Sequence, residues 1–322
     1  MKRIEIKYKE KGYYTLSQVE REFLALVKPT IERKLTSLKL RNKKRKSLVI
    51  RLVSNLNTIL IGKPLALENF VRGIKKSGLL NSLDDRKFSN RLSKIFNYKS
   101  FRGSVKKGVW LGNILSIKAC LYCNSQFTLS LTKSKKLTYT FDHFFPQTKY
   151  PFLAVSMYNL IPCCNYCNQR KSKSEYLLDE LISPHVESFD DILIFKTDPS
   201  SIINFISGKY KSNDLIQLKL EYKRTNPLIN GTEKFKNQLF QFDLEDVYEN
   251  HKDIVGEIYI KSKIYTPAFR KYLKAFNKYT AFLTDDQVDQ LIVGNYVSNN
   301  DINRRPLAKL CQDISREARM IK

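Results

Sequence analysis

Apolar and charged residues recur at helical spacing through most of the first third of the chain. Thr15 followed by Gln18 fits a capping box, which predicts a helix reaching through residues 19–40. Pro29 is expected to kink or split this helix. Further amphipathic helices are expected at three stretches: residues 47–61, 64–76 and 84–98.

Strand signals are short and widely spaced. Residues 127–131 and 137–141 have alternating, β-branched or aromatic character on either side of KSKK, which predicts a β-hairpin. A short strand is expected at residues 4–10 and a strand pair at 216–224. Helices are expected again at two C-terminal stretches, residues 243–265 and 304–322. The pattern predicts an α+β fold that is mostly helical.

Length and composition limit the class of protein. At 322 residues the chain has the length of about two domains. Hydrophobic residues make up 42% and charged residues 27%, as in globular proteins, so wholesale disorder is excluded. No apolar run approaches the ~18–20 residues of a membrane helix, and no apolar stretch follows the basic N-terminus. Neither a membrane span nor a signal peptide is expected.

Positive charge is concentrated toward the N-terminus. The chain has 57 Lys and Arg against 31 Asp and Glu, a net charge of +26, and residues 1–110 hold 28 and 8 of them. Such an excess favours polyanionic partners, nucleic acid first. We therefore expect residues 1–110, with the run RNKKRK at 41–46, to form a basic helical region that binds nucleic acid. A solvated basic surface without a partner is the alternative.

Five of the six cysteines are clustered in the second region, residues 111–182. Two CxxC pairs separated by 40 residues predict a closed tetrahedral zinc site: Cys120, Cys123, Cys164 and Cys167. Binding zinc would join two distant stretches of chain and stabilise the fold. Cys163 allows another register, but Cys164 restores the CxxC spacing, so Cys163 and Cys311 are expected to be buried thiols. Clustering of this kind is typical of metal binding in a reducing cytoplasm.

The segment between the two pairs combines a carboxylate with an imidazole. The second strand of the predicted hairpin runs into Asp142 and His143. Asp142 is suited to a hard divalent cation, and His143 can take a proton near neutral pH. Activity that depends on His143 should then rise with pH through a midpoint near ~6.5, or higher if Asp142 raises its pKa. His185 and His251 lack metal-spaced partners, so surface or core-edge roles are expected for them.

Polar residues continue beyond this pair. Asn159 lies in YNLIP, and Asn168 follows the last cysteine at the start of a polar helix candidate. Basic side chains on the same candidate helix are expected to hold substrate phosphates, with a solvated helix surface as the alternative: Arg170, Lys171 and Lys173.

These motifs resemble the HNH (ββα-metal) endonucleases that carry a zinc-binding CxxC pair. The resemblance covers about a fifth of the chain. Within it, DHFFPxxKYPFLAxSxYNLIPxCxxCN is similar to the PtuB-like HNH effectors of Septu/retron anti-phage defence systems, as is the C-terminal GNY…RRPLAKL…DI. The resemblance implies a mostly helical α+β chain with an embedded zinc-stabilised ββα-metal nuclease module.

The resemblance also implies a role for each matching residue. His143 would be the general base that deprotonates the attacking water, and Asp142 would bind the catalytic Mg²⁺ or Mn²⁺. Asn159 would hold the backbone of the histidine-bearing loop. Asn168 stands where the family often has histidine, and an amide oxygen there would be a second Mg²⁺ ligand.

The implied activity is hydrolysis of DNA phosphodiester bonds in the cytoplasm. A partner ATPase (PtuA-like), and in some systems a retron reverse transcriptase with its DNA, would restrain the nuclease. Residues 183–322, mixed and mainly helical, would be the docking region, because the charge asymmetry assigns DNA to residues 1–110. The alternatives are a homing or restriction-type HNH enzyme, an RNase, and a catalytically silent zinc module that binds nucleic acid or a protein.

Overall fold

The computed structural model describes residues 1–6, 12, 15–172, 174–223, 230–280 and 283–321, without the side chains of 277–280. The chain forms two compact units. One comprises residues 3–117 and 128–187, and the other residues 1–2, 118–127 and 188–322. The three regions expected from the sequence, with boundaries near residues 110 and 182, were defined by charge and cysteine positions. They describe expected functions rather than compact units, and they stay predictions.

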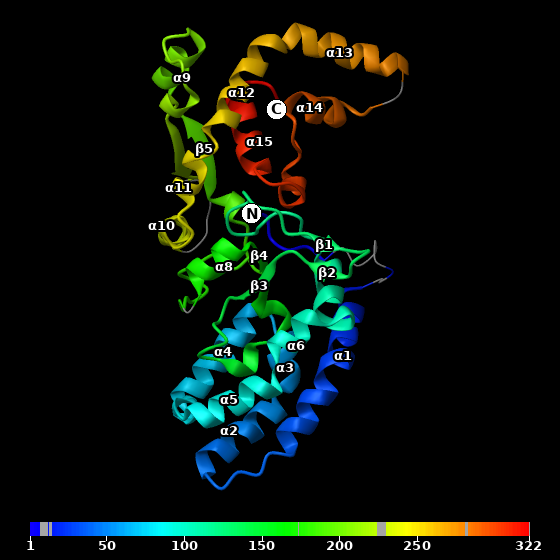
Figure 1. Ribbon diagram of the computed structural model, residues 1–322, viewed down its shortest axis with the longest axis vertical. Helices are drawn as coiled ribbons and strands as arrows, with labels where there is room; N and C mark the ends of the chain where they lie inside the picture. Colours follow the sequence, from blue (N-terminus) through cyan, green and yellow to red (C-terminus); the bar gives the residue numbers. More distant parts are fainter. Residues whose placement is uncertain (7–11, 13–14, 173, 224–229, 281–282, 322) are drawn as a thin grey trace. The chain divides into compact units, whose positions relative to one another are not determined.

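The unit that contains residues 3–117 is built mainly of helices (Figure 1). Its helices are α1 (Leu16–Thr36), α2 (Lys43–Ser54), α3 (Leu56–Ile61), α4 (Pro64–Lys76), α5 (Arg86–Ile95), α6 (Tyr98–Gly103), α7 (Trp110–Leu115) and α8 (Asn165–Lys171). The expected helix at 47–61 is divided between α2 and α3. Four of the six residues of the basic run at 41–46 belong to α2, because Asn42 caps that helix.

Helix α1 begins at the predicted capping box. The Thr15 side chain accepts a hydrogen bond from the Gln18 backbone, and the Gln18 side chain accepts one from the Thr15 backbone. The helix passes through Pro29 without division, so the expectation of a split was wrong. Pro29 has no N–H to donate to the Ala25 carbonyl, four residues earlier in the helix. Because Pro29 and Ala25 are both exposed, water can hydrogen-bond that carbonyl instead.

The core of this unit follows from four-residue spacing on α1. Buried apolar residues repeat along one face of the helix: Val19, Phe23, Val27, Ile31 and Leu35. This face packs against α2 and α3, and the Phe23 ring lies 6.0 Å from that of Phe101 on α6. Burial of such side chains stabilises a fold by about 1.5–3 kcal/mol each.

Two short antiparallel sheets belong to the same unit. β1 (Ser130–Leu131) pairs with β2 (Lys136–Leu137) across the turn where the hairpin was expected. The predicted second strand ends early, and its last residues form β3 (Thr140–His143), which pairs with β4 (Leu160–Cys163) instead. α8 follows β4 and packs against β3, which gives a ββα arrangement (Figure 1).

The second unit combines helices with one sheet. Its elements are β5 (Leu193–Thr197), α9 (Pro199–Ile206), β6 (Leu218–Tyr222), α10 (Gly231–Gln241), α11 (Leu244–Glu249), α12 (Lys252–Ile264), α13 (Pro267–Thr280), α14 (Asp285–Val293) and α15 (Ala308–Glu317). Where a strand pair was expected at 216–224, the described residues contain one strand, β6, which pairs with β5; residue 224 lies outside the described residues. The helix expected at 243–265 is divided between α11 and α12.

The described residues are mostly helical with small antiparallel sheets, consistent with the α+β class expected from the sequence. Of the strand expected at 4–10, residues 4–6 have no regular secondary structure and 7–10 lie outside the described residues. No described helix is both long and apolar enough to cross a membrane.

Candidate functional site

The ββα arrangement brings three of the sequence-predicted site residues close to one another. Asp142 and His143 end β3, and in the antiparallel register they lie opposite Ile161 and Leu160. Asn159 immediately precedes β4, so it lies beside the end of β3. The pairing of β3 with β4 therefore places the start and the end of the intervening loop together.

His143 is held as a neutral, buried imidazole. Its Nε2 atom lies 2.9 Å from the Ala154 carbonyl oxygen, and Tyr98 meets the ring edge-on with 4.5 Å between centroids. A carbonyl can only accept a hydrogen bond, so Nε2 carries the proton and Nδ1 keeps a lone pair. Burial lowers the pKa of His143 to about 4. This value is below the ~6.5 or higher on which the expected pH dependence was based, because desolvation of the imidazolium outweighs the attraction of Asp142; the pH dependence of activity itself stays a prediction.

Asp142 is paired with a buried lysine. Its Oδ2 atom lies 3.3 Å from the Nζ atom of Lys171, whose side chain is fully buried at 0% exposure. The same ammonium group donates to the carbonyl oxygens of His143 at 2.8 Å and Phe144 at 3.0 Å. Lys171 was expected on the surface as a phosphate ligand; its burial contradicts that expectation, because an enclosed ammonium cannot contact a phosphate in solvent.

Asn159 makes three hydrogen bonds to the backbone of the loop. Its Oδ1 atom accepts from the Phe145 N–H at 2.7 Å, and its Nδ2 donates to the carbonyls of Phe145 at 3.0 Å and Leu153 at 3.1 Å. The side chain is completely buried. These are backbone contacts of the kind that the family resemblance implied, and a catalytic consequence of them stays a prediction.

The remaining predicted residues of α8 differ in exposure. Asn168 is half-buried in the middle of the helix, and Arg170 is exposed near its end. Lys173 lies outside the described residues. Exposure at Arg170 is compatible with the phosphate contact expected there, which stays a prediction.

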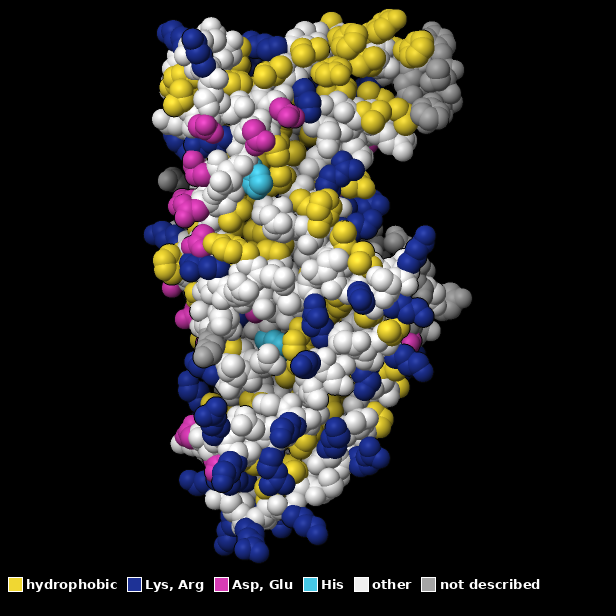
Figure 2. Space-filling view, viewed as in Figure 1, with side chains coloured by type: hydrophobic (Ala, Val, Ile, Leu, Met, Phe, Trp, Pro, Cys, Tyr) yellow, Lys and Arg dark blue, Asp and Glu magenta, His cyan; other side chains and the backbone are white. Residues whose placement is uncertain are grey.

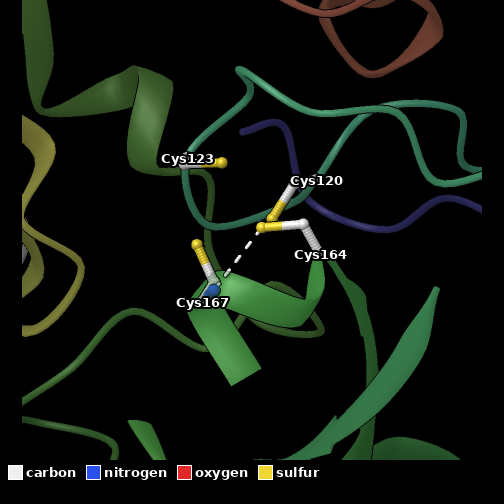
Figure 3. A group of neighbouring side chains, drawn as sticks. All are labelled: Cys120, Cys123, Cys164 and Cys167. Atoms are coloured by element: carbon white, nitrogen blue, oxygen red, sulfur yellow. Dashed lines mark hydrogen bonds between the residues drawn. The ribbon is translucent and has the colours of Figure 1, made fainter. Parts of the chain in front are cut away.

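The four cysteines of the two CxxC pairs form a buried cluster (Figure 3). The ligand atoms of Cys120, Cys123, Cys164 and Cys167 all lie within 4.8 Å of one another. A tetrahedral zinc ion with bonds of ~2.3 Å to sulfur separates its ligands by about 3.8 Å, so this set fits a metal such as zinc. The preference for Cys164 over Cys163 is confirmed, because Cys163 is not in the group.

Local backbone geometry explains how both CxxC turns form. Asn124 follows the first pair with a positive φ of 55°, a conformation that asparagine tolerates, and its N–H bonds the Cys120 carbonyl at 2.9 Å. The Tyr248 hydroxyl donates to the Cys123 carbonyl at 2.7 Å. In the second pair the Cys167 N–H donates to the Cys164 sulfur at 3.4 Å, so this sulfur also caps α8 (Figure 3).

The other cysteines and histidines lie in the core or at its edge, as expected from the sequence. Cys163 and Cys311 are buried free thiols, and burial raises the pKa of each. His185 is half-buried with its Nε2 3.0 Å from the Leu160 carbonyl oxygen, and burial lowers its pKa to about 4. His251 is half-buried at the start of α12.

Sequence reasoning missed the buried contacts of Lys171 and missed Tyr98 altogether, although both residues touch the end of β3. Lys171 follows Cys167 by four positions, so both share the buried face of α8, and this spacing was a usable signal. Tyr98 donates its hydroxyl hydrogen to the Phe141 carbonyl at 2.9 Å and accepts from the Phe141 N–H at 3.1 Å. No local pattern marks Tyr98, because it lies 43 residues from its partner.

Taken as a class, the chain is an α+β protein with a four-cysteine cluster that could hold a metal. No protein-family model matches it, and no solved structure matches it. Among curated proteins, the Septu protein PtuB of Bacillus thuringiensis is 29% identical over 101 residues. These residues are 31% of this chain and 34% of that protein, so the chain spans about a third of the length of the relative it matches.

Proposed function

We propose that the chain is a divalent-metal-dependent HNH-type endonuclease that hydrolyses DNA phosphodiester bonds. The observation that carries the proposal is the state of His143, a neutral imidazole at the end of β3 whose Nε2 proton is engaged by Ala154. The order Asp-His, Asn, Asn along a ββα arrangement and the partial similarity to a Septu protein support it further. An anti-phage defence role follows from that similarity.

His143 is suited to act as general base. Its Nδ1 lone pair is the proton acceptor left once Nε2 donates to the Ala154 carbonyl, and 6% of the residue remains accessible. A pKa of about 4 keeps the ring in the neutral form at neutral pH. General-base catalysis of this kind contributes about 10²–10⁴-fold, so other groups must supply the rest of the rate.

Asp142 and Asn168 are the residues that would hold Mg²⁺ or Mn²⁺. A carboxylate and an amide oxygen are the donor types that Mg²⁺ accepts, with water and substrate phosphate completing its shell. The bound ion would stabilise the negative charge that develops on the phosphate. The chain's own contribution is to hold Asp142 beside His143, through β3 and the Lys171 contact.

The substrate-binding surface that we propose lies on the unit with α1 to α8. Figure 2 shows Lys and Arg side chains gathered over the part of this unit formed by α2 and α5. Exposed cations there include Arg41, Lys43, Lys44 and Lys46 before and at the start of α2, and Arg86, Lys87, Arg91 and Lys94 on α5. Contacts from such side chains to phosphates give affinity without sequence preference.

Partners are proposed from the similarity alone. A PtuA-like ATPase, and a retron reverse transcriptase with its DNA, would bind residues 183–322 and restrain cleavage.

A second function is favoured by one observation. The buried Asp142 carboxylate already has the Lys171 ammonium as a counter-charge, so it does not need a metal ion to balance it. A catalytically silent zinc module that binds nucleic acid would keep this pair as a purely structural contact.

The two functions are separated by cleavage assays with a metal-ligand variant. Wild-type protein and Asp142→Asn are incubated with supercoiled plasmid or with tRNA, in Mg²⁺ or in EDTA, after zinc content is matched. The nuclease proposal expects wild-type protein to nick plasmid in Mg²⁺ alone and Asp142→Asn to lose this activity. Cleavage of tRNA and not plasmid would indicate an RNase. Plasmid binding without cleavage under every condition would support the silent module.

A further inference from the structure

The two peptide groups that follow His143 are held from both sides. On one side, the N–H of Phe144 donates to the Asn159 carbonyl at 3.0 Å and the N–H of Phe145 donates to the Asn159 Oδ1 atom at 2.7 Å. On the other side, the carbonyls of His143 and Phe144 accept from Lys171 at 2.8 and 3.0 Å. Each peptide group thus has its N–H on Asn159 and its C=O on Lys171.

The ammonium group of Lys171 has no exposed surface to share with solvent. It offers three protons, and it has three acceptors: the two carbonyls and the Asp142 carboxylate at 3.3 Å. A buried charge is tolerated only when it is paired and fully hydrogen-bonded, and Lys171 meets both conditions. It is therefore a cross-link between the end of α8 and the end of β3.

We propose that Lys171 is a positioning residue for the hydrolysis assigned above. The inference rests on the proposed function. Lys171 holds the backbone on the C-terminal side of His143, so that the imidazole keeps one orientation, and it holds the Asp142 carboxylate beside that imidazole. A misplacement of about 1 Å at a reacting group can cost ~10²-fold in rate, so this cross-link bears directly on catalysis.

The same residue connects the cysteine cluster to the loop. α8 is seven residues long, its N-cap is Cys164, it contains Cys167, and it ends at Lys171. A metal on the cysteines would hold the start of this helix, and Lys171 at its other end would transmit that rigidity to the loop after His143. Metal bound at the cysteines would thus support catalysis without contacting substrate.

The test compares Lys171→Met with a matched lysine variant. Lys149→Met makes the same substitution at a half-exposed ion pair, where Lys149 lies 2.6 Å from Glu175. Both proteins are measured for zinc content, for amide hydrogen exchange over residues 143–145, and for kcat and KM on plasmid DNA with Mg²⁺. Lys171→Met should keep its zinc, exchange these amides at least about tenfold faster, and lose about 100-fold in kcat with KM within about threefold. Lys149→Met should match wild type.

Asp142→Asn separates this inference from the proposed function. It replaces the carboxylate of the proposed metal ligand by a neutral amide but leaves both carbonyl bonds of Lys171, so exchange over 143–145 should stay within about threefold of wild type while cleavage is lost. If wild-type protein cleaves nothing, the nuclease proposal fails, and hydrogen exchange then decides only whether Lys171 holds the loop after His143.

A second variant keeps the inference testable if Lys171→Met fails to fold. Lys171→Met strands a buried carboxylate, so the double variant Lys171→Met/Asp142→Asn removes that charge as well, and its loop amides should still exchange at least about tenfold faster. A folded, zinc-loaded Lys171→Met, or the folded double variant, with wild-type exchange over 143–145 overturns the inference. So does a Lys171→Met protein whose KM rises while kcat is unchanged.

Discussion

Two adjacent buried cysteines offer a matched test of the metal cluster. The Cys164 sulfur belongs to the four-cysteine group within 4.8 Å, whereas the Cys163 sulfur lies 4.0 Å from the Thr140 hydroxyl oxygen. Burial raises the pKa of Cys163, so it stays a thiol. Serine at either position replaces one sulfur by oxygen. The two variants therefore differ only in whether the sulfur is lost from the four-cysteine group or from the site beside Thr140.

The two substitutions should differ greatly in magnitude. Structural zinc contributes an apparent ~10–16 kcal/mol in zinc-finger peptides, which equals or exceeds the ~5–15 kcal/mol net stability of most domains. Cys164→Ser should therefore lose the metal and most of the stability of its unit. Cys163→Ser buries a hydroxyl beside Thr140, at a cost of about 1–3 kcal/mol. With about 2–4 °C per kcal/mol for a unit of this size, its thermal midpoint should fall by about 2–12 °C.

Zinc stoichiometry after gel filtration, measured by plasma mass spectrometry, shows which of the two cysteines is the metal ligand. We expect about one zinc per chain in wild type and in Cys163→Ser, and much less than one in any soluble Cys164→Ser. EDTA should lower the thermal midpoint of wild type and Cys163→Ser alike. A zinc-loaded Cys164→Ser together with a zinc-free Cys163→Ser would refute the assignment of ligands.

Three further predictions concern the base, the loop and the basic surface. Because burial lowers the pKa of His143 to about 4, the base is deprotonated above that value, so single-turnover cleavage rates should vary little between pH ~5.5 and 8; a midpoint near 6.5 would show that the imidazole is solvated. Asn159→Ala leaves one buried donor and two carbonyls without their bonds, so chemical denaturation should show a loss of about 3 kcal/mol or more, and a loss below ~1 kcal/mol would mean that water replaces the amide. Alanine at Lys43, Lys44 and Lys46 should reduce the slope of log K against log salt for duplex DNA by up to about 2.7, measured by fluorescence anisotropy, and an unchanged slope would place DNA elsewhere.

Local signals predicted the parts of the fold that depend on local contacts. The capping box at Thr15 marks the start of α1, because capping involves residues within one turn. The CxxC spacing likewise predicted the cysteine cluster, including the choice of Cys164.

Long-range contacts account for what local signals missed. β3 pairs with β4 across a 16-residue loop rather than continuing the hairpin, and nothing in either segment specifies its partner. The low pKa of His143 depends on enclosure by distant groups such as Tyr98, which adjacent sequence does not reveal. Lys171 looked like one more surface charge on a basic helix, and the three acceptors around it appear only once β3 and α8 meet.

The most direct test of the proposed hydrolase compares two similar histidines. His143 and His185 are both held with Nε2 near a backbone carbonyl, at 2.9 and 3.0 Å, and burial lowers the pKa of each to about 4. The single-turnover rate of Mg²⁺-dependent plasmid nicking is measured for His143→Ala and His185→Ala at equal zinc content. Loss of the general base should slow His143→Ala by about 10²–10⁴-fold, with His185→Ala within about tenfold of wild type. Equal nicking by both variants would contradict the assignment of His143 as the catalytic base.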